Sequence, residues 1–167
     1  MILVTVGTHT APFDPLVKAA EAYAEMVTEE VVIQRGVSRC VPRSARSFDF
    51  CTSVELAALM EASRVVVCHA ADTVLDALRL ERPVVAVTRL RQFGEHINDH
   101  QVDFAHALAL AGWVHVLDDP MNLAVVIEAA ASAPPPVPPA NPGLANAIRR
   151  QILEWFPPDG PRNACPS

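Results

Sequence analysis

The sequence lacks the features expected of a membrane-spanning, metal-stabilised or nucleic-acid-binding protein. No apolar run approaches the roughly 20 residues that a membrane-spanning helix needs. The four cysteines, at positions 40, 51, 68 and 165, show neither CxxC nor any other metal-ligand spacing. The net charge of −6 argues against a general nucleic-acid-binding face, so we expect no nucleic-acid partner. One local basic cluster remains, in a single loop: Arg35, Arg39, Arg43 and Arg46.

No signal peptide is recognisable ahead of the first apolar run, which begins at Ile2. We therefore expect a reducing, cytoplasmic environment. Cys51 and Cys68 border apolar runs and are expected to be buried thiols rather than halves of a disulfide. If the protein works at a membrane, something else must hold it there.

The residues that are present indicate a well-buried globular chain. The length of 167 residues is enough for one domain with its own core. Hydrophobic residues make up 51% of the chain and charged residues 19%, as in a globular protein. Short apolar runs predict strands at residues 2–6, 31–34, 48–51, 65–67, 84–87 and 113–117. Helical patterns fall between them, at residues 14–26, 53–62, 74–80, 98–111 and 120–131. This alternation predicts an α/β fold, a Rossmann-like doubly wound parallel sheet.

Capping signals refine the expected helix ends. Asp14 is expected as an N-cap followed by Pro15 at N1, and Ser53, or else Thr52, as the cap of the next helix, with Glu55 or Glu61 supporting it. Gly112 is expected at the C′ position of the helix at 98–111.

The last part of the chain differs in composition from the rest. We assign residues 1–132 to the sheet domain, 133–143 to a proline-rich linker, 144–156 to a final helix and 157–167 to a flexible tail.

Ligands of parallel sheets sit beyond the carboxyl ends of the strands, so the polar turns there are the candidate site. The first turn is Gly7, Thr8 and His9. A glycine after a strand lets backbone N–H groups approach an anion, and Thr8 and His9 add side-chain donors. Equally, Gly7 could simply permit a sharp exit from the strand.

The second turn runs from His69 through Ala70, Ala71 and Asp72 to Thr73. Small residues between a strand and a helix expose the helix N-terminal amides, whose partial positive charge suits a diphosphate. Asp72 or Thr73 could instead be an ordinary N-cap, and the charge of Asp72 would repel a phosphate unless it points away. Asp76, one turn further, could accept hydrogen bonds from ribose hydroxyls or be a solvated helix residue.

The third turn, residues 93–101, is unusually polar for so apolar a chain. His96 and His100 are four residues apart, so they would share a helix face and a metal pair is conceivable. No third ligand is evident and the HExxH pattern is absent, so we expect no metal. A polyhydroxylated ligand suits this mixture of side chains better, whereas a plain helix start would leave Phe93 and Gly94 unexplained.

Three segments carry a resemblance to a known family: VTVGTHTAPFDPLVKA, HAADTVLDALRLERPVVAVTRL and FGEHINDHQVDFA. They resemble the PssE/EpsF-type exopolysaccharide glycosyltransferase subunits of bacteria. They are also similar to the catalytic subunit of the two-part eukaryotic enzyme that adds the second N-acetylglucosamine to dolichol diphosphate. All resemble the detached C-terminal half of a GT-B glycosyltransferase of the MurG type, and the match covers residues 1–131.

The resemblance implies a nucleotide-diphosphate-sugar site in this chain. The implied substrate-binding residues are Gly7, Thr8, His69, Ala70, Ala71, Asp72, Thr73, Asp76, Arg89, Phe93, Gly94, Glu95, His96, Asp99, His100 and Gln101. Within that set, His69 to Thr73 would meet the diphosphate and Asp76 the ribose. His100 and Gln101 would contact the donor sugar. His9 is the candidate catalytic base, although the base could equally lie on a partner.

The resemblance also implies a division of labour. It predicts the donor-binding subunit of an inverting, metal-independent and cofactor-free enzyme that transfers a sugar from a UDP-sugar. The acceptor would be a polyprenyl-diphosphate-linked glycan in bacterial exopolysaccharide assembly. A separate, membrane-anchored N-terminal-half subunit would bind that acceptor and hold this cytoplasmic chain at the inner face of the membrane. Nothing in the sequence selects glucose, glucuronate or N-acetylglucosamine as the sugar.

Departures from the family pattern leave rival functions open. Ala70 and Ala71 replace the usual two glycines in a turn one residue shorter, and an alanine methyl keeps a phosphate further from the backbone. Glu81 stands where a glycine usually ends the helix, and Thr88 replaces a usual proline. A non-catalytic subunit that stabilises a membrane-bound partner is therefore the main alternative. A nucleotide-binding regulator that works alone is a further one.

Overall fold

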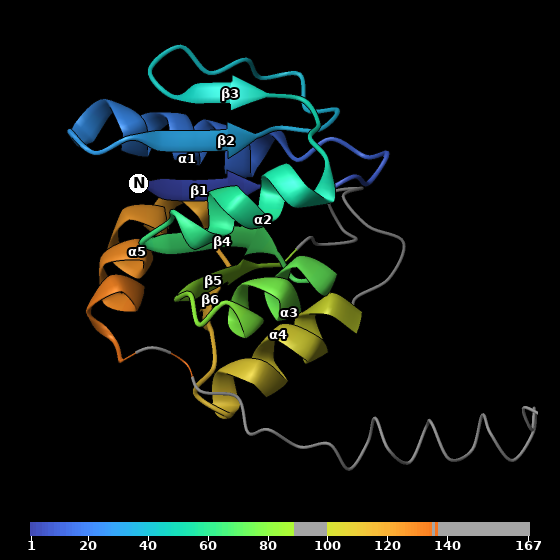
Figure 1. Ribbon diagram of the computed structural model, residues 1–167, viewed down its shortest axis with the longest axis vertical. Coiled ribbons are helices and arrows are strands. Elements are labelled where there is room, and N and C mark those ends of the chain that lie inside the picture. Colours follow the sequence, from blue (N-terminus) through green and yellow to red (C-terminus); the bar gives the residue numbers. More distant parts are fainter. Residues whose placement is uncertain (89–99, 135, 137–167) are drawn as a thin grey trace, which may run out of the picture.

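The structure is a computed structural model that describes residues 1–88, 100–134 and 136 (Figure 1). The strands are β1 (Ile2–Thr5), β2 (Val31–Gln34), β3 (Arg46–Phe48), β4 (Val65–His69), β5 (Val84–Val87) and β6 (His115–Leu117). The helices are α1 (Asp14–Met26), α2 (Ser53–Glu61), α3 (Asp72–Arg79), α4 (His100–Leu110) and α5 (Leu123–Ser132). A short 3₁₀ turn, η2 (Pro120–Asn122), leads into α5.

All described strands form one parallel sheet in the order β3-β2-β1-β4-β5-β6. The centre is β1, where Leu3 lies opposite Val32 of β2 and Val66 of β4. The chain winds outward from β1 in one direction through β3 and in the other through β6. This is the doubly wound order, so the predicted fold class is confirmed. The direction changes between β1 and β4, and a crevice is expected at their carboxyl ends.

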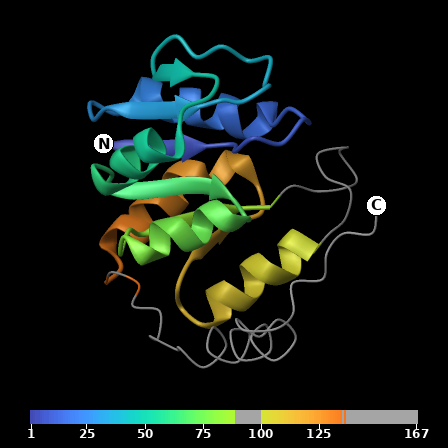
Figure 2. The same cartoon turned by 45° about the vertical axis from the view of Figure 1, so that its right-hand side comes forward.

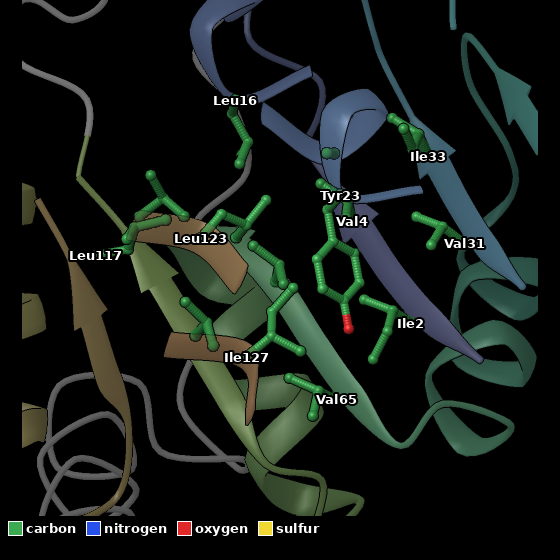
Figure 3. Packing of buried hydrophobic residues seen from close by; sticks show 14 of the residues in the cluster. Ile2, Val4, Leu16, Tyr23, Val31, Ile33, Val65, Leu117, Leu123 and Ile127 are labelled. Atoms are coloured by element: carbon green, nitrogen blue, oxygen red, sulfur yellow. The ribbon is translucent and has the colours of Figure 1, made fainter. Parts of the chain in front are cut away.

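Alternate residues of the strands pack into two separate cores. Ile2 and Val4 of β1 face the cluster built with α1 and α5, which Figure 3 shows around Tyr23, Leu123 and Ile127. Leu3, between them, faces the cluster built with α2, α3 and α4. Figures 1 and 2 show the same division, with α2 and α3 on one face of the sheet and α1 and α5 on the other. Since both faces are covered, the four inner strands β1, β2, β4 and β5 are buried along their whole length and are almost entirely apolar.

Asp14 does not cap α1, so that prediction is wrong. Phe13 occupies the N-cap position, and Asp14 is the first helical residue. The Asp14 carboxylate instead accepts hydrogen bonds from the backbone N–H groups of Arg39 and Cys40, at 2.7 and 2.9 Å. The Asp14 carboxylate thus accepts from two loop N–H groups instead of from the N-terminal N–H groups of the helix. These two bonds fix the loop to α1.

Glu21, two turns further along α1, holds the same loop. Its carboxylate accepts from the backbone N–H groups of Arg43, Ser44 and Ala45. Partial burial raises the pKa of Glu21, but these N–H bonds outweigh burial and leave the pKa below its ordinary value. The arginine-bearing loop is therefore built on two carboxylates of α1.

The strand expected at residues 48–51 lies earlier, at Arg46–Phe48. It pairs with β2 through Val32, Ile33 and Gln34, so Phe50 falls in the loop beyond the carboxyl end of β3. The cap of α2 is the second of the two residues expected for it, Thr52 rather than Ser53. Thr52 is the N-cap and forms a capping box with Glu55, each side chain accepting from the other's backbone N–H.

Two helices end in the same motif with different residues. After α4, Gly112 has a φ of +74° and its N–H donates to Ala109, while the N–H of Trp113 donates to Leu108. This Schellman ending confirms Gly112 at C′. After α3, Glu81 has a φ of +55°, and the N–H groups of residues 81 and 82 make the equivalent bonds. Glu81 is the one non-glycine residue in the described ranges with a positive φ.

No helix within the described ranges is long and apolar enough to span a bilayer. The predicted linker, final helix and tail fall almost entirely on residues outside the described part, and those assignments stay predictions.

Candidate functional site

A pocket of about 370 Å³ opens at the carboxyl edge of the sheet, where the loops after β1, β3 and β4 meet. It lies at the position where the winding of the sheet changes direction. Its lining residues come from all three loops and from β2, α2, β4 and α3: Gly7, Thr8, His9, Gln34, Phe50, Cys51, Leu56, His69, Ala71, Asp72 and Thr73. The structure therefore brings together the first and second polar turns predicted from the sequence.

Gly7 uses its backbone groups inside the protein. Its N–H donates to Oε1 of Gln34 at 3.0 Å and to Oγ1 of Thr5 at 3.2 Å, and its carbonyl accepts from Nε2 of Gln34 at 3.0 Å. The N–H of Gly7 itself is therefore engaged within the protein. Thr8 and His9 are the other residues of this loop that line the pocket, and the anion-binding role expected of the loop stays a prediction.

His9 has a defined tautomer when it is neutral. The backbone N–H of Ala11 donates to Nδ1 of His9 at 3.0 Å, so Nδ1 carries a lone pair. A neutral imidazole has one proton, which must then sit on Nε2. In this arrangement Nε2–H is a hydrogen-bond donor. An Nε2–H group can donate a hydrogen bond to a phosphate or hydroxyl oxygen, but it cannot take a proton from the hydroxyl group of an acceptor substrate.

His69 ends β4 and is 8% exposed. Its imidazole lies against the backbone of Gly7, so close that a β-carbon at residue 7 would stand 2.3 Å from Cε1 of His69. Gly7 also has a φ of +74°, which side-chain-bearing residues rarely adopt. Glycine is therefore required at position 7 both for the turn and for the approach of the ring.

The two alanines of the second turn have different surroundings. Ala70 is 1% exposed, belongs to the core cluster on the α2–α4 face, and donates its N–H to the carbonyl of Val87 at 3.0 Å. Ala71 lines the pocket and is the N-cap of α3, with a φ of −145°. Neither alanine has a positive φ, so the turn needs no glycine for its backbone. Only Ala71 stands where a methyl group would meet a ligand.

The first turn of α3 supplies the positive end of a helix dipole to the pocket. Asp72 and Thr73 are its first two residues, so neither is the N-cap that the sequence also allowed. Both line the pocket, and Asp72 is exposed. The backbone amides here favour an anion, whereas the Asp72 carboxylate opposes one placed beside it.

Asp76 lies in a different hollow. It is exposed, forms an ion pair with Arg79 at 2.7 Å, and lines a space of about 270 Å³ between α2 and α3. Leu56 lines both this space and the main pocket, so the two adjoin. The ribose-binding role implied for Asp76 stays a prediction.

Four pocket residues were missed by the sequence analysis: Gln34, Phe50, Cys51 and Leu56. Phe50 and Cys51 were placed in a strand that in fact ends at Phe48, which hid their position in a loop beside the site. The thiol of Cys51 has a raised pKa, caused by burial and then by the charge of Glu55, so it is neutral at physiological pH. Gln34 carried a usable signal, since it is a polar residue ending the apolar run VVIQ.

The third polar turn is not placed by the structure. Arg89, Phe93, Gly94, Glu95, His96 and Asp99 lie outside the described residues. His100 and Gln101 begin α4, but their side chains are not among those described. Within the described residues, no three His, Cys, Asp or Glu side chains are grouped so as to hold a metal ion.

Solved structures similar to this one include two glycosyltransferases and an epimerase. The glycotransferase of kitacinnamycin aligns with a TM-score of 0.61 and 19% identity, covering 92% of this chain and 39% of its own. The calicheamicin glycosyltransferase CalG4 aligns with a TM-score of 0.62 and 17% identity, covering 93% and 44%. The UDP-GlcNAc 2-epimerase of Neisseria meningitidis, solved bound to UDP-GlcNAc, aligns with a TM-score of 0.56 and 16% identity, covering 92% and 43%.

These identities establish a shared fold, and this chain spans about two fifths of each of those proteins. No significant match to a curated protein is found. The sequence model of the glycosyltransferase family 28 C-terminal domain matches residues 1–134, which include every strand and helix of the sheet domain and all residues that line the pocket. The chain belongs to the glycosyltransferase family 28 C-terminal domain family.

Proposed function

We propose that this chain is the donor-binding half of a glycosyltransferase that uses a UDP-sugar. The observation that carries the proposal is the pocket at the carboxyl ends of β1 and β4, where Thr8, His9 and the first turn of α3 converge. A nucleoside diphosphate needs donors for its phosphates and an apolar surface for its base. Phe50, which is 53% exposed, and Leu56 supply that surface in the same pocket.

The diphosphate is proposed to lie at the N-terminus of α3, beside Ala71 and Thr73. The amides there carry a partial positive charge, and they stabilise the negative charge that develops on the diphosphate as the sugar leaves. The UDP-GlcNAc 2-epimerase of similar fold was solved bound to UDP-GlcNAc, which supports a UDP-sugar as the ligand class.

His9 is proposed to bind the donor rather than to act as the general base. An inverting transfer needs a base that takes a proton from the acceptor hydroxyl. The Nδ1 lone pair of His9 is engaged by the N–H of Ala11, and the proton on Nε2 makes that atom a donor. The base is therefore expected on the half of the enzyme that binds the acceptor.

A second, membrane-anchored subunit is proposed to complete the enzyme. The similar transferases are more than twice as long as the part this chain matches, which supports a missing acceptor-binding half. We propose that this half binds a polyprenyl-diphosphate-linked glycan in bacterial exopolysaccharide assembly, as the PssE/EpsF-type resemblance implies. Transfer would be inverting and independent of metal ions.

One observation favours a non-catalytic role instead. The methyl group of Ala71 and the carboxylate of Asp72 both stand at the place proposed for the diphosphate. If they prevent binding, the chain would only stabilise its partner subunit.

A reconstituted transfer assay separates the two functions. The chain is combined with its membrane-anchored partner, a polyprenyl-diphosphate-linked acceptor and a panel of UDP-sugars, and UDP release is measured. The catalytic proposal predicts release with at least one sugar, and a loss of release when Thr73→Ala and His9→Ala are combined. Release that is unaffected by these substitutions, or none with any sugar, would support the non-catalytic role.

A further inference from the structure

Gln34 occupies an unusual position for a polar side chain. It ends β2, is 3% exposed, and its amide group contacts two different loops. Oε1 accepts from the N–H of Gly7 at 3.0 Å and from the hydroxyl of Thr5 at 2.5 Å. Nε2 donates to the carbonyl of Gly7 at 3.0 Å and to the carbonyl of Asp49 at 2.8 Å.

These four bonds use the whole hydrogen-bonding capacity of the amide, which has two N–H donors and two acceptor lone pairs. A glutamate at this position would turn a carboxylate oxygen toward two carbonyl groups. A leucine of similar size would leave the carbonyls of Gly7 and Asp49 without this donor. Among residues that reach this far, glutamine satisfies both loops.

The two loops follow β1 and β3, the strands on either side of β2, and both contribute residues to the pocket. Gly7 is followed by Thr8 and His9, and Asp49 is followed by Phe50. Asp49 is further fixed because its carbonyl accepts from the N–H of Gly36 at 3.0 Å and its carboxylate pairs with Arg35 at 2.5 Å. The Gln34 side chain thus connects the loop that carries Thr8 and His9, the proposed hydrogen-bond donors to the phosphates, with the loop that carries the Phe50 ring.

We propose that Gln34 is a positioning residue for the donor nucleotide, and that it sets the spacing between Thr8 and Phe50. This rests on the proposed function of the pocket as a nucleoside-diphosphate site. Gln34 need not touch the ligand to act. It fixes both loops before the ligand arrives, so that neither has to be ordered on binding.

A purely structural role would make a different prediction, and a matched control exposes it. Ser38 is 2% exposed, and its Oγ accepts from the backbone N–H of Phe13 at 3.0 Å. It is likewise a buried side chain that bonds to a loop amide, but it does not line the pocket. Ser38→Ala therefore removes a buried hydrogen bond to a loop amide without altering the spacing of the two loops.

The test compares the full chain with its Gln34→Glu, Gln34→Leu and Ser38→Ala variants. Amide exchange rates and chemical shifts are measured by NMR without ligand, and the Kd for UDP is measured by titration. Both Gln34 variants are expected to accelerate exchange of the Gly7 amide, to shift the Phe50 signal, and to raise the Kd at least tenfold. Ser38→Ala is expected to change the Kd less than twofold, even where it lowers the melting temperature as much.

The outcomes distinguish this proposal from the one it rests on. If the wild-type chain binds UDP and the Gln34 variants bind it equally well, the positioning role is overturned while the proposed function stands. The same holds if the Kd in every variant follows the loss of stability alone. If wild-type protein does not bind UDP, the proposed function fails and the donor-positioning role fails with it.

Discussion

The imidazole of His69 rests on the backbone of Gly7, and this contact joins the ends of the two central strands at the pocket. A β-carbon on Gly7 would lie 2.3 Å from Cε1 and 3.0 Å from Nδ1 of that ring. A β-carbon essentially never approaches another heavy atom to 2.3 Å, so any side chain at position 7 must displace His69 or the loop. The packing of His69 against this loop therefore depends on the absence of a β-carbon at Gly7.

Gly7→Ala tests this contact against a control with the same backbone angle. Gly112 also has a φ of +74°, but a β-carbon there would meet nothing within 4 Å. Gly112→Ala should cost about 1 kcal/mol through backbone strain alone and leave UDP affinity unchanged. Gly7→Ala should cost more, on the order of 2–4 kcal/mol, because overpacking adds to the strain. It should also weaken UDP binding.

Urea unfolding and UDP titration of both variants provide the measurement. Equal losses of stability in the two variants would show that His69 yields to the methyl group without cost, which contradicts the packing described above.

Ala71→Gly is expected to strengthen UDP binding, since it removes the methyl group that stands at the N-terminus of α3. Ala70→Gly is the matched control. Ala70 is buried in the core, so its replacement should cost about 1 kcal/mol of stability and leave the affinity for UDP unchanged. Calorimetric titration of both variants checks this. A gain in affinity at Ala70 but not at Ala71 would place the ligand elsewhere.

Glu81→Gly should stabilise the protein by about 1 kcal/mol. Glu81 holds a φ of +55° at the end of α3, where glycine carries no steric penalty, and the two Schellman hydrogen bonds are made by the backbone and would remain. Chemical denaturation of the two proteins gives the difference. An unchanged or lower stability would mean that the Glu81 side chain contributes an interaction that offsets its strain.

Tyr23 is the single tyrosine of the chain, so its ionisation can be followed by absorbance without assignment. Burial, and then a 3.1 Å hydrogen bond to Glu128, raises the pKa of Tyr23 to about 12 from its ordinary value near 10. Because the folded pKa is the higher one, the stabilisation is complete below pH 10 and is lost as pH rises toward 12.

Glu128→Gln should lower the pKa of Tyr23 while leaving it above 10, because the variant removes the charge and keeps the burial shown in Figure 3. Far-UV circular dichroism at each pH confirms that the protein stays folded. A wild-type midpoint near 10 in folded protein would contradict the contact between Tyr23 and Glu128.

The fold could be predicted from the sequence because its main determinant is local. Strands covered on both faces must be apolar at consecutive positions, and runs such as VVV at 65–67 show this directly. The N-cap of α2 could be predicted to within one residue, since the capping box of Thr52 and Glu55 lies within four residues of sequence. Asp14 was misassigned because its partners, the amides of Arg39 and Cys40, lie 25 and 26 residues away.

The site could be predicted only in part for the same reason. The turns after β1 and β4 were found because each is a polar segment that follows a buried strand. The role of Gln34 could not be found, since its partners Gly7 and Asp49 are 27 and 15 residues distant in sequence. Phe50 was hidden because β3, a strand of three residues with a weak apolar signal, ends three residues earlier than predicted.

The most direct test of the proposed function is an NMR titration of the wild-type chain with UDP, followed through the backbone amide signals. The account predicts saturable shifts by millimolar UDP at Thr8, Phe50 and the first turn of α3, with small shifts at the opposite edge of the sheet. The same concentration of adenosine 5′-diphosphate should give weaker shifts. No saturable shift at these residues, or shifts confined to another surface, would contradict the assignment of this pocket to a nucleotide-sugar donor.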